Sequence, residues 1–376
     1  MIASVSNPLL ELRKLGVSVW LDDISRSMLA DGSLARLIHD DGVAGLTSNP
    51  AIFANSMMND ARYAPAIAQL LPHVPSAMAL YEELALEDLR AAARLLRPQY
   101  ESTSRADGFV SFEVSPHLAY DAPGSMQEAQ RLWARLELPN AFIKIPGTEA
   151  GLPVIRDLVG RGINVNVTLL FSPERYRAVA LAYIDGLRAL ADAGRPLSGV
   201  ASVASFFLSR IDTAVDQRLD ALAARGQPAA RALRGKAAIA SACRAYEIYE
   251  EIIALPAWQE LLALGARPQR LLWASTSTKD PGFSPIKYVE ELVVPDTVNT
   301  MPLETLNTYR RLGEPELRLE RHIAEASDVR EGLERLDVDL EAVAQQLERE
   351  GGAKFIEPFD RLQGWLESQR AAPRPS

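Results

Sequence analysis

Residues 141–169 read AFIKIPGTEAGLPVIRDLVGRGINVNVTL, and this stretch decides the fold. It begins with an apolar run at 141–145 and ends with a β-branched run at 163–169, and both runs are typical of buried strands. The segment between them has the apolar spacing of a helix. A strand, a helix and a second strand in this order predict two parallel strands joined by a helical crossover.

Short runs of this kind recur eight times along the chain. We predict strands at residues 17–22, 44–48, 109–114, 141–145, 163–169, 199–204, 270–275 and 291–294. Segments of helical period lie between them, including 125–137, 173–193 and 236–254. Eight strand–helix units close into a barrel, so we expect an α/β fold: a single (β/α)8 TIM barrel with extra helices. A doubly wound sheet is the alternative, but it would usually show a glycine-rich turn where this chain has Asp22-Asp23.

Two parts of the chain exceed a minimal barrel. Residues 51–107 separate the second and third predicted strands and form an inserted helical segment, and the region after 302 is helical and highly charged. We expect Gly351-Gly352 to interrupt that region before a last amphipathic helix. A barrel with such additions fits one domain, so we predict a single domain over 1–370 and a disordered tail at 371–376.

Composition narrows the classes of partner and cofactor. The 376-residue chain has a formal net charge of -9, which disfavours nucleic acid. One cysteine excludes an internal disulfide and favours a reducing compartment. The N-terminus lacks a basic region followed by an apolar run, and no apolar stretch of about 18 residues occurs, so we expect a cytoplasmic protein without a membrane partner. The four histidines are scattered, so we expect no metal and no other cofactor.

Polar residues at the predicted strand ends are the candidates for an active site, because barrel enzymes carry their sites at the carboxyl ends of the strands. The first seven predicted strands, or the turns after them, supply Asp22, Asn49, Glu113, Lys144, Asn166, Thr168, Ser205, Arg210, Ser275 and Lys279.

Lys144 is the most informative of these residues. Its neighbours in the strand are apolar, and strand alternation puts it on the buried inner face with Phe142. Desolvation favours the neutral amine of a lysine, and a neutral amine can attack a carbonyl to form an imine. A lysine that only pairs with a carboxylate is the alternative. Asp22 and Glu113 on nearby strand ends favour catalysis, because two carboxylates in different environments can divide the proton transfers of an aldol cleavage.

Five motifs resemble those of the transaldolases, and they occur in the same order. They are Leu46-Thr-Ser-Asn-Pro50, Val110-Ser-Phe-Glu-Val114, Phe142-Ile-Lys-Ile-Pro146, Asn166-Val-Thr-Leu-Leu-Phe-Ser172 and Trp273-Ala-Ser-Thr-Ser-Thr-Lys279. The resemblance runs from about residue 17 to 301, and the final helix is also similar. The length and the Thr-Lys-Asp segment resemble the longer bacterial branch of the family.

The resemblance implies a transferase of carbohydrate metabolism, in the pentose phosphate pathway. Such an enzyme moves a dihydroxyacetone unit from sedoheptulose 7-phosphate or fructose 6-phosphate to glyceraldehyde 3-phosphate or erythrose 4-phosphate. It implies that Lys144 forms the Schiff base, that Asp22 handles the proton of the cleaved bond, and that Glu113 and Thr168 position a water. It also implies a set of substrate-binding residues: Asn49, Asn166, Ser205, Phe207, Arg210, Ser275 and Lys279.

Within that set the resemblance places Ser205, Arg210 and Ser275 on the phosphate. Shorter members of the family often carry an arginine where this chain has Ser277, and Lys279 is the nearest cation.

Other readings stay open at this stage. A fructose-6-phosphate-aldolase-like enzyme would cleave the same bond and release the three-carbon unit, but that sister family typically has glutamine and tyrosine at the positions of Glu113 and Phe207. A non-catalytic phosphosugar-binding barrel would tolerate loss of Lys144 or Asp22, and both are present. The oligomeric state, monomer or homodimer, and the preferred sugar pair stay undecided.

Overall fold

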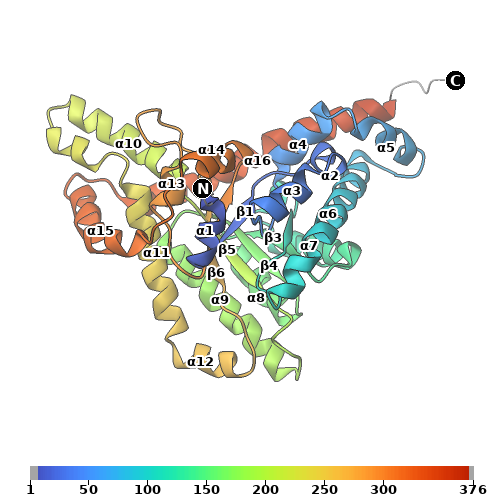
Figure 1. Ribbon diagram of the computed structural model, residues 1–376, viewed down its shortest axis with the longest axis horizontal. Coiled ribbons are helices and arrows are strands. Elements are labelled where there is room, and N and C mark those ends of the chain that lie inside the picture. The colour runs from blue at the N-terminus through green and yellow to red at the C-terminus, as the bar shows by residue number, and fades with distance from the viewer. Residues whose placement is uncertain (1–6, 372–376) are drawn as a thin grey trace, which may run out of the picture.

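The computed structural model describes residues 7–371 and shows a curled parallel sheet surrounded by helices (Figure 1). Within the described residues the sheet has seven strands, in the order β1-β7-β6-β5-β4-β3-β2. Their bounds are β1 Val17–Leu21, β2 Val110–Glu113, β3 Ala141–Pro146, β4 Val165–Leu170, β5 Ser202–Phe207, β6 Arg270–Ala274 and β7 Thr297–Met301. Every pairing is parallel, as the strand–helix alternation predicts.

Residues 44–47 close the gap between the two edge strands. This segment forms parallel bridges with β1 and β2, at Leu21–Leu46 and Gly45–Phe109. Ala44 N donates to Val19 O at 2.8 Å, and Leu46 N donates to Phe109 O at 2.8 Å. The predicted strand at 44–48 is therefore a short extended segment with only two bridges. It still occupies the second position of an eight-membered barrel, so the predicted architecture is confirmed.

The predicted strand at 291–294 is wrong, because the last strand is β7 at 297–301. Val293 and Val294 are buried, as their apolar character requires. However, the carbonyl of Val293 accepts from Arg318 N, at 3.1 Å, rather than from a neighbouring strand. Pro295 then lacks a backbone N–H, and Asp296 takes a φ of 61°, so the sheet begins only after them. The strand predicted at 199–204 is shifted as well, to 202–207.

Helices fill the remaining connections. Their bounds are α1 Pro8–Lys14, α2 Arg26–Ala30, α3 Ser33–Asp40, α4 Pro50–Asn59, α5 Tyr63–Leu70, α6 Ala77–Ser102, η1 Pro116–Leu118, α7 Ala122–Leu136, α8 Gly151–Gly160, α9 Pro173–Asp192, α10 Ser209–Ala224, η2 Pro228–Leu233, α11 Ala237–Ile253, α12 Pro256–Ala263, α13 Lys287–Glu290, α14 Leu303–Leu312, α15 Leu319–Glu334 and α16 Leu340–Ala371. Side-chain caps start several of them: Ser172 Oγ, for example, accepts from Arg175 N before Pro173 opens α9.

The inserted segment is helical, as predicted, and contains α4, α5 and α6. The expected break at Gly351-Gly352 is wrong, because α16 runs unbroken through both glycines and through Pro358. Helix α16 packs on α4, α6 and α10, and this tertiary packing outweighs the low helix propensity of glycine. Of the tail predicted at 371–376, Ala371 ends α16 and residues 372–376 lie outside the described part of the chain.

Aromatic side chains fill the half of the barrel interior that lies toward the amino-terminal ends of the strands. Phe109 stacks on Phe142 with ring centroids 4.3 Å apart, and Trp20 lies 6.1 Å from Phe142. Beneath them, Asp107 accepts hydrogen bonds from Trp20 Nε1 at 3.1 Å and from Ser18 Oγ at 2.6 Å. This packed layer fills the amino-terminal half of the barrel interior, and the interior cavity lies at the carboxyl ends of the strands.

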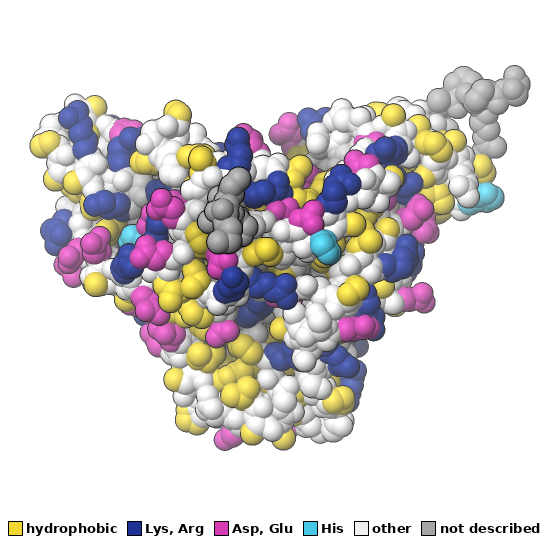
Figure 2. Space-filling model, in the orientation of Figure 1, with side chains coloured by type: hydrophobic (Ala, Val, Ile, Leu, Met, Phe, Trp, Pro, Cys, Tyr) yellow, Lys and Arg dark blue, Asp and Glu magenta, His cyan; other side chains and the backbone are white. Residues whose placement is uncertain are grey.

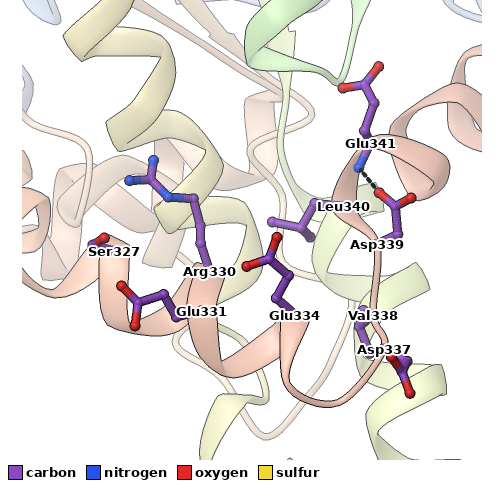
Figure 3. Close-up of a pocket in the computed structure, with 9 residues that line it drawn as sticks. All are labelled: Ser327, Arg330, Glu331, Glu334, Asp337, Val338, Asp339, Leu340 and Glu341. Atoms are coloured by element: carbon purple, nitrogen blue, oxygen red, sulfur yellow. Dashed lines mark hydrogen bonds between the residues drawn. The ribbon is translucent and has the colours of Figure 1, made fainter.

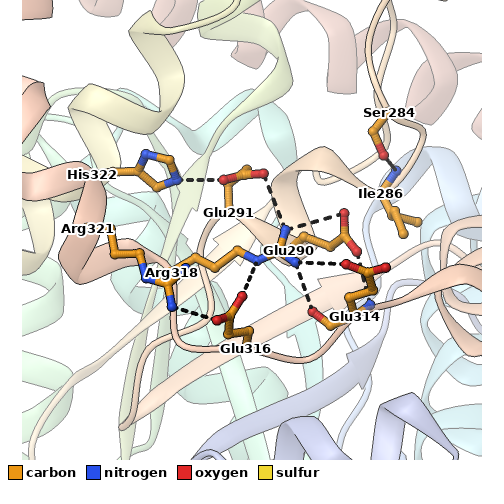
Figure 4. A network of polar contacts seen from close by, with 9 residues as sticks. All are labelled: Ser284, Ile286, Glu290, Glu291, Glu314, Glu316, Arg318, Arg321 and His322. Atoms are coloured by element: carbon orange, nitrogen blue, oxygen red, sulfur yellow. Dashed lines mark hydrogen bonds and ion pairs between the residues drawn. The ribbon is translucent and has the colours of Figure 1, made fainter.

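The helices after β7 are tied to the barrel by charged side chains, which we call the Arg318 cluster (Figure 4). Arg318 lies 3.5 to 3.8 Å from four carboxylates, and His322 Nε2 lies 2.6 Å from one of these, Glu291. The four carboxylates belong to Glu290, Glu291, Glu314 and Glu316. The cluster fixes the start of α15 beside α13, where the wrongly predicted strand would have been.

The surface has no large region of one charge on the face drawn in Figure 2, where acidic and basic side chains are interspersed. Among the described residues, no helix is long and apolar enough to cross a membrane.

Candidate active site

A cavity of ≈190 Å³ lies at the carboxyl ends of the strands. Most of the residues predicted for the site line it: Asp22, Asn49, Lys144, Thr168, Ser205, Phe207, Arg210, Ser275 and Lys279. The other two, Glu113 and Asn166, are 6% and 0% exposed and lie behind this lining, where they contact Lys144 and Ser205. The structure therefore brings the predicted residues together from seven segments of the chain.

Lys144 is buried near the end of β3, with only 4% of its surface exposed. Its Nζ donates to the backbone carbonyl of Ser48 at 2.9 Å and lies 3.1 Å from Glu113 Oε2. Strand register explains the contact with Glu113, because Glu113 pairs with Lys144 across β2 and β3 and both side chains point inward. The amine is thus held by two oxygens at the edge of a cavity.

Asp22 and Glu113 flank the lysine, and both have a raised pKa. Burial raises the pKa of Asp22, although a 2.6 Å hydrogen bond from Thr47 Oγ1 and the charge of Lys144 oppose the shift. Burial likewise raises the pKa of Glu113 against the nearby charge of Lys144. Each carboxylate can therefore take up a proton more readily than an exposed one.

A hydrogen-bonded row of neutral side chains crosses the barrel beneath the cavity. Ser205 Oγ donates to Asn166 Oδ1 at 2.7 Å, and Asn166 Nδ2 donates to Ser111 Oγ at 3.1 Å. These contacts fix the orientation of the Asn166 amide. Thr168 Oγ1, one step further along β4, is buried without a hydrogen-bond partner among residues 7–371, so it can bind a ligand atom.

Asn49 lies at the amino terminus of α4. Its Oδ1 caps that helix by accepting from Ile52 N at 3.0 Å, and Pro50 occupies the first helical position. The capping hydrogen bond uses Oδ1, so the amide nitrogen, Nδ2, can donate a hydrogen bond to a ligand in the cavity.

The opposite side of the cavity carries the cations. Arg210, at the start of α10, has a buried Nη1 without a hydrogen-bond partner among residues 7–371. Burial lowers the pKa of its guanidinium. Lys279 is exposed, and its Nζ donates to Ser277 Oγ at 2.6 Å. An incompletely paired arginine and a lysine at one cavity suit an anionic group.

Ser275, directly after β6, has a positive φ of 54°. Ser209 holds this turn, because Ser209 N donates to Ser275 O at 3.2 Å and the two hydroxyls are 2.8 Å apart. Backbone strain of this kind in a non-glycine residue often marks a functional site. The turn aims Ser275 at the cavity next to Arg210.

Comparisons with known proteins identify the family. The model of the transaldolase/fructose-6-phosphate aldolase family matches residues 19–366. The chain belongs to this family. It is 44% identical over 375 residues to Transaldolase 2 of Nostoc sp., covering 96% of this chain and 97% of that protein. It is 45% identical over 352 residues to the transaldolase of Thiobacillus denitrificans, covering 94% and 97%, and 46% identical over 361 residues to that of Acidothermus cellulolyticus, covering 95% of each chain.

Six further residues line the cavity of this transaldolase-family chain and were not predicted as site residues: Thr47, Ala274, Ser277, Thr300, Pro302 and Phe355. Thr300 was hidden by the misplaced last strand, since the alternation of Thr297–Met301 would have put it on the inner face. Thr47 ends the second predicted strand together with Ser48 and Asn49, so its place was predicted although no role was assigned to it. Phe355 comes from α16, far along the chain, and no local pattern indicates that it reaches the barrel.

A second cavity, of ≈700 Å³, lies between α15 and α16 and differs in kind (Figure 3). Its walls carry Arg330 and several carboxylates, among them Glu331, Glu334 and Glu341. It contains no lysine and none of the residues that the family resemblance implies. Among the described residues, no group of three or more His, Cys, Asp or Glu side chains could hold a metal ion, here or elsewhere.

Proposed function

We propose that this chain is a transaldolase that moves a dihydroxyacetone unit between phosphosugars through a Schiff base on Lys144. The observation that supports it best is the placement of Lys144 Nζ, 3.1 Å from Glu113 Oε2 and at the edge of the cavity that Asp22 also lines. A buried amine beside two carboxylates of raised pKa has the groups that imine formation and aldol cleavage require.

In the first step, the amine of Lys144 attacks the carbonyl carbon C2 of the ketose phosphate. Glu113 accepts a proton from the lysine, and a proton returns to the carbinol oxygen, which leaves as water when the imine forms. Thr168 Oγ1 is buried without a hydrogen-bond partner among the described residues, and the buried Glu113 Oε2 lies 3.1 Å from Lys144 Nζ, where a carboxylate oxygen can accept a second hydrogen bond. They are suited to hold that water and to direct it back when the imine is hydrolysed.

In the second step, Asp22 accepts the proton of the C4 hydroxyl. The C3–C4 bond breaks, its electron pair moves into the protonated imine, and the aldose phosphate leaves as an aldehyde. The three-carbon unit stays on Lys144 as an enamine. An acceptor aldose phosphate reverses the step: the enamine carbon attacks its carbonyl carbon, and Asp22 returns the proton.

The cavity divides into a hydroxyl side and a phosphate side. We assign Asn49, Asn166 and Ser205 to the sugar chain, because Asn166 pairs with Lys144 in the strand register, Ser205 donates to Asn166, and Asn49 lines the same cavity. Phe207 also lines the cavity, and we assign it to the phosphate side because its ring lies 5.6 Å from Arg210 Cζ. The phosphate is assigned to Arg210, Ser275 and Lys279. Ser205, which the resemblance places on the phosphate, donates its hydrogen bond to Asn166, and this orientation suits the sugar chain better.

The donors would be sedoheptulose 7-phosphate or fructose 6-phosphate, and the acceptors glyceraldehyde 3-phosphate or erythrose 4-phosphate, as in the pentose phosphate pathway. A cytoplasmic location is proposed as well, because these substrates are phosphorylated metabolites and the one cysteine, Cys243, is free and buried. The protein would act as a monomer or a homodimer.

The test is borohydride reduction in the presence of fructose 6-phosphate, followed by peptide mass mapping. We expect a three-carbon adduct on Lys144 and complete loss of activity in Lys144→Ala. An adduct on Lys236 or Lys279 would contradict the assignment. Absence of any adduct, with binding of the sugar retained, would indicate a non-catalytic phosphosugar-binding barrel.

A second measurement separates transfer from simple cleavage. With fructose 6-phosphate alone, a transaldolase should release little free dihydroxyacetone. Adding erythrose 4-phosphate should produce sedoheptulose 7-phosphate at a much higher rate. Release of dihydroxyacetone at the same rate with and without acceptor would instead identify a fructose-6-phosphate-aldolase-like lyase.

A further inference from the structure

Helix α16 passes across the mouth of the barrel. Its 32 residues span about 48 Å, and it contacts α10, β4, η1, α4 and α6. Figure 1 shows its later turns beside α4, on the far side from α10. Its last turn is held by Arg370, whose guanidinium donates to the carbonyls of Val74 and Pro75, each at 2.8 Å. The helix is therefore anchored on both sides of the cavity.

Gly351 is a position where α16 packs closely against residues beside the site. A Cβ at this position would lie 3.0 Å from Leu169 Cδ2 and 3.6 Å from Arg210 Nη1. Leu169 lies at the irregular end of β4 and is 2% exposed, so its side chain would have to shift by a few tenths of an ångström within a packed region. The next glycine, Gly352, would meet nothing within 4 Å. A side chain would therefore be tightly packed at Gly351 and unhindered at Gly352.

One turn later, Phe355 faces the guanidinium of Arg210. The Arg210 Cζ lies 5.8 Å from the centroid of the Phe355 ring and 5.6 Å from that of Phe207, which comes from the end of β5. Phe355 also lines the cavity. Two aromatic rings, one from β5 and one from α16, therefore hold a guanidinium whose buried Nη1 is without a hydrogen-bond partner among residues 7–371.

We propose that Phe355, brought into place by the close approach at Gly351, positions Arg210 to bind the phosphate of the sugar substrate. An arginine in solution samples many rotamers and loses this freedom when it binds a ligand. Contact with the two rings fixes the planar guanidinium beforehand without using its N–H groups, because a cation is attracted to the ring face. A paired carboxylate would fix the side chain too, but it would compete with the phosphate. This inference rests on the proposed function, which assigns Arg210 to the phosphate.

Phe359, one turn further along α16, offers a matched control. It is 5% exposed, as Phe355 is, but its ring packs on Tyr81 and His117 and does not line the cavity. Phe355→Leu and Phe359→Leu therefore remove similar packing from the same helix. Thermal unfolding of both variants would show that they fold and lose comparable stability.

The test compares KM and kcat for fructose 6-phosphate, with erythrose 4-phosphate as acceptor, and the inhibition constant of inorganic phosphate. Phe355→Leu should raise KM and the inhibition constant roughly 3- to 30-fold, the range of a cation–π contact, and leave kcat nearly unchanged. The kinetic constants of Phe355→Leu for unphosphorylated fructose should equal those of the unsubstituted protein. Phe359→Leu should change none of these constants. Gly351→Ala should act in the direction of Phe355→Leu, and Gly352→Ala should not.

The proposal is overturned if Phe355→Leu and Phe359→Leu behave alike, or if Phe355→Leu impairs phosphorylated and unphosphorylated donors equally. It is also overturned if Phe355→Leu still weakens phosphate inhibition when Arg210 has been replaced by alanine, because Phe355 would then act independently of Arg210. If Arg210→Ala alone leaves phosphate inhibition unchanged, the phosphate assignment of the proposed function fails, and the positioning role fails with it. Binding of inorganic phosphate can be followed by calorimetry even in a variant without activity.

Discussion

Two clusters in this molecule each bring carboxylates close to cationic side chains, and they differ in solvation. In the barrel mouth, Asp22 and Glu113 share Lys144, and burial raises the pKa of both carboxylates even though Glu113 is 3.1 Å from the amine. In the Arg318 cluster, Glu291 is about one-third exposed, and its hydrogen bond with His322 lowers its pKa (Figure 4). Distance to a cation therefore does not decide the direction of the shift.

Removal from water decides it. A carboxylate that loses its hydration needs more compensation than one neighbouring ammonium group supplies, whereas a half-exposed carboxylate keeps part of its hydration and gains from each cation. The buried cluster in the barrel mouth contains carboxylates that exchange protons readily, and their burial lowers the stability of the fold. The Arg318 cluster adds modest stability and holds the C-terminal helices in place. Activity should thus depend on the barrel mouth, and stability on the Arg318 cluster.

The largest effect should come from replacing the two carboxylates in the barrel mouth. Asp22→Ala and Glu113→Ala should each lower kcat by about 10²- to 10⁴-fold, the usual loss for a general acid–base group. They should fail at different steps. After borohydride reduction, Asp22→Ala should carry the intact six-carbon sugar on Lys144, because cleavage stalls, and Glu113→Ala should form any adduct slowly.

The mass of the trapped adduct is the measurement. If Asp22→Ala trapped only the three-carbon fragment at the normal rate, Asp22 would not be the cleavage base, and the role would pass to Glu113 or to a water held by Asn49 and Thr168. Glu291→Ala in the Arg318 cluster is the control and should leave the adduct and the rate unchanged.

Two arginines give the next largest contrast. Arg210→Ala should raise KM for phosphosugars roughly 10- to 100-fold, from loss of a charge-assisted contact of about 1.5–3 kcal/mol, and should affect unphosphorylated donors much less. Arg318→Ala should leave KM unchanged and lower the midpoint of urea unfolding, because it removes the common partner of four glutamates. Steady-state kinetics on both donor types and urea titrations would check this. Equal loss on both donor types would make Arg210 a structural residue.

Neutralising one carboxylate in each cluster should change the free energy of unfolding by about 1 kcal/mol, with opposite signs in the two clusters. The folded pKa of Asp22 is raised, so its ionisation costs stability once the pH exceeds the unfolded value, and Asp22→Asn should stabilise the protein at pH 7. The pKa of Glu291 is lowered in the folded protein. Glu291 therefore stabilises the fold at pH values above its pKa in the unfolded chain, about 4.3, and this stabilisation is lost as the pH falls through its pKa in the folded protein. Glu291→Gln should therefore destabilise the protein at pH 7 and have no effect in strong acid.

Urea unfolding of both variants at pH 7 and at low pH measures this difference. Stabilisation by both substitutions, or by neither, would mean that burial does not distinguish the clusters in the way described.

The smallest expected effect is none. If the protonated imine on Lys144 accepts the electrons of the cleaved bond, the reaction needs no metal to stabilise them, and chelation with EDTA should leave the rate unchanged. A large loss that added metal restores would show that the Schiff-base account is incomplete.

The inner face of the barrel could be predicted because it follows a two-residue period. Once 141–145 is taken as a strand, Lys144 must share a face with Phe142, and the same rule places Asn166 and Thr168 together. The last strand could not be placed in this way. Val293 and Val294 have the apolar, β-branched character of a strand and are buried. However, the carbonyl of Val293 accepts hydrogen bonds from the start of α15, and no local sequence pattern indicates this tertiary contact.

The reach of α16 could not be predicted either. Gly351-Gly352 reads as a helix end when judged by propensity alone, and only the three-dimensional structure shows that Gly351 serves close packing within an unbroken helix. The aromatic contact between Phe355 and Arg210 joins positions 145 residues apart, so no pattern within one element could have revealed it.

The position of α16 across the barrel mouth also has a consequence for the order in which the site is completed during synthesis. Every residue that we assign to chemistry or to direct substrate contact, from Asp22 to Lys279, precedes Phe355 by at least 76 positions. At a translation rate of about 5–20 residues per second, roughly 4–15 s separate Lys279 from Phe355. During that interval the nascent chain contains Lys144, Asp22 and Glu113, to which we assign the chemistry, but not the helix that we propose completes the phosphate side. The residues proposed for bond cleavage are thus synthesised before the residue proposed to govern phosphate binding.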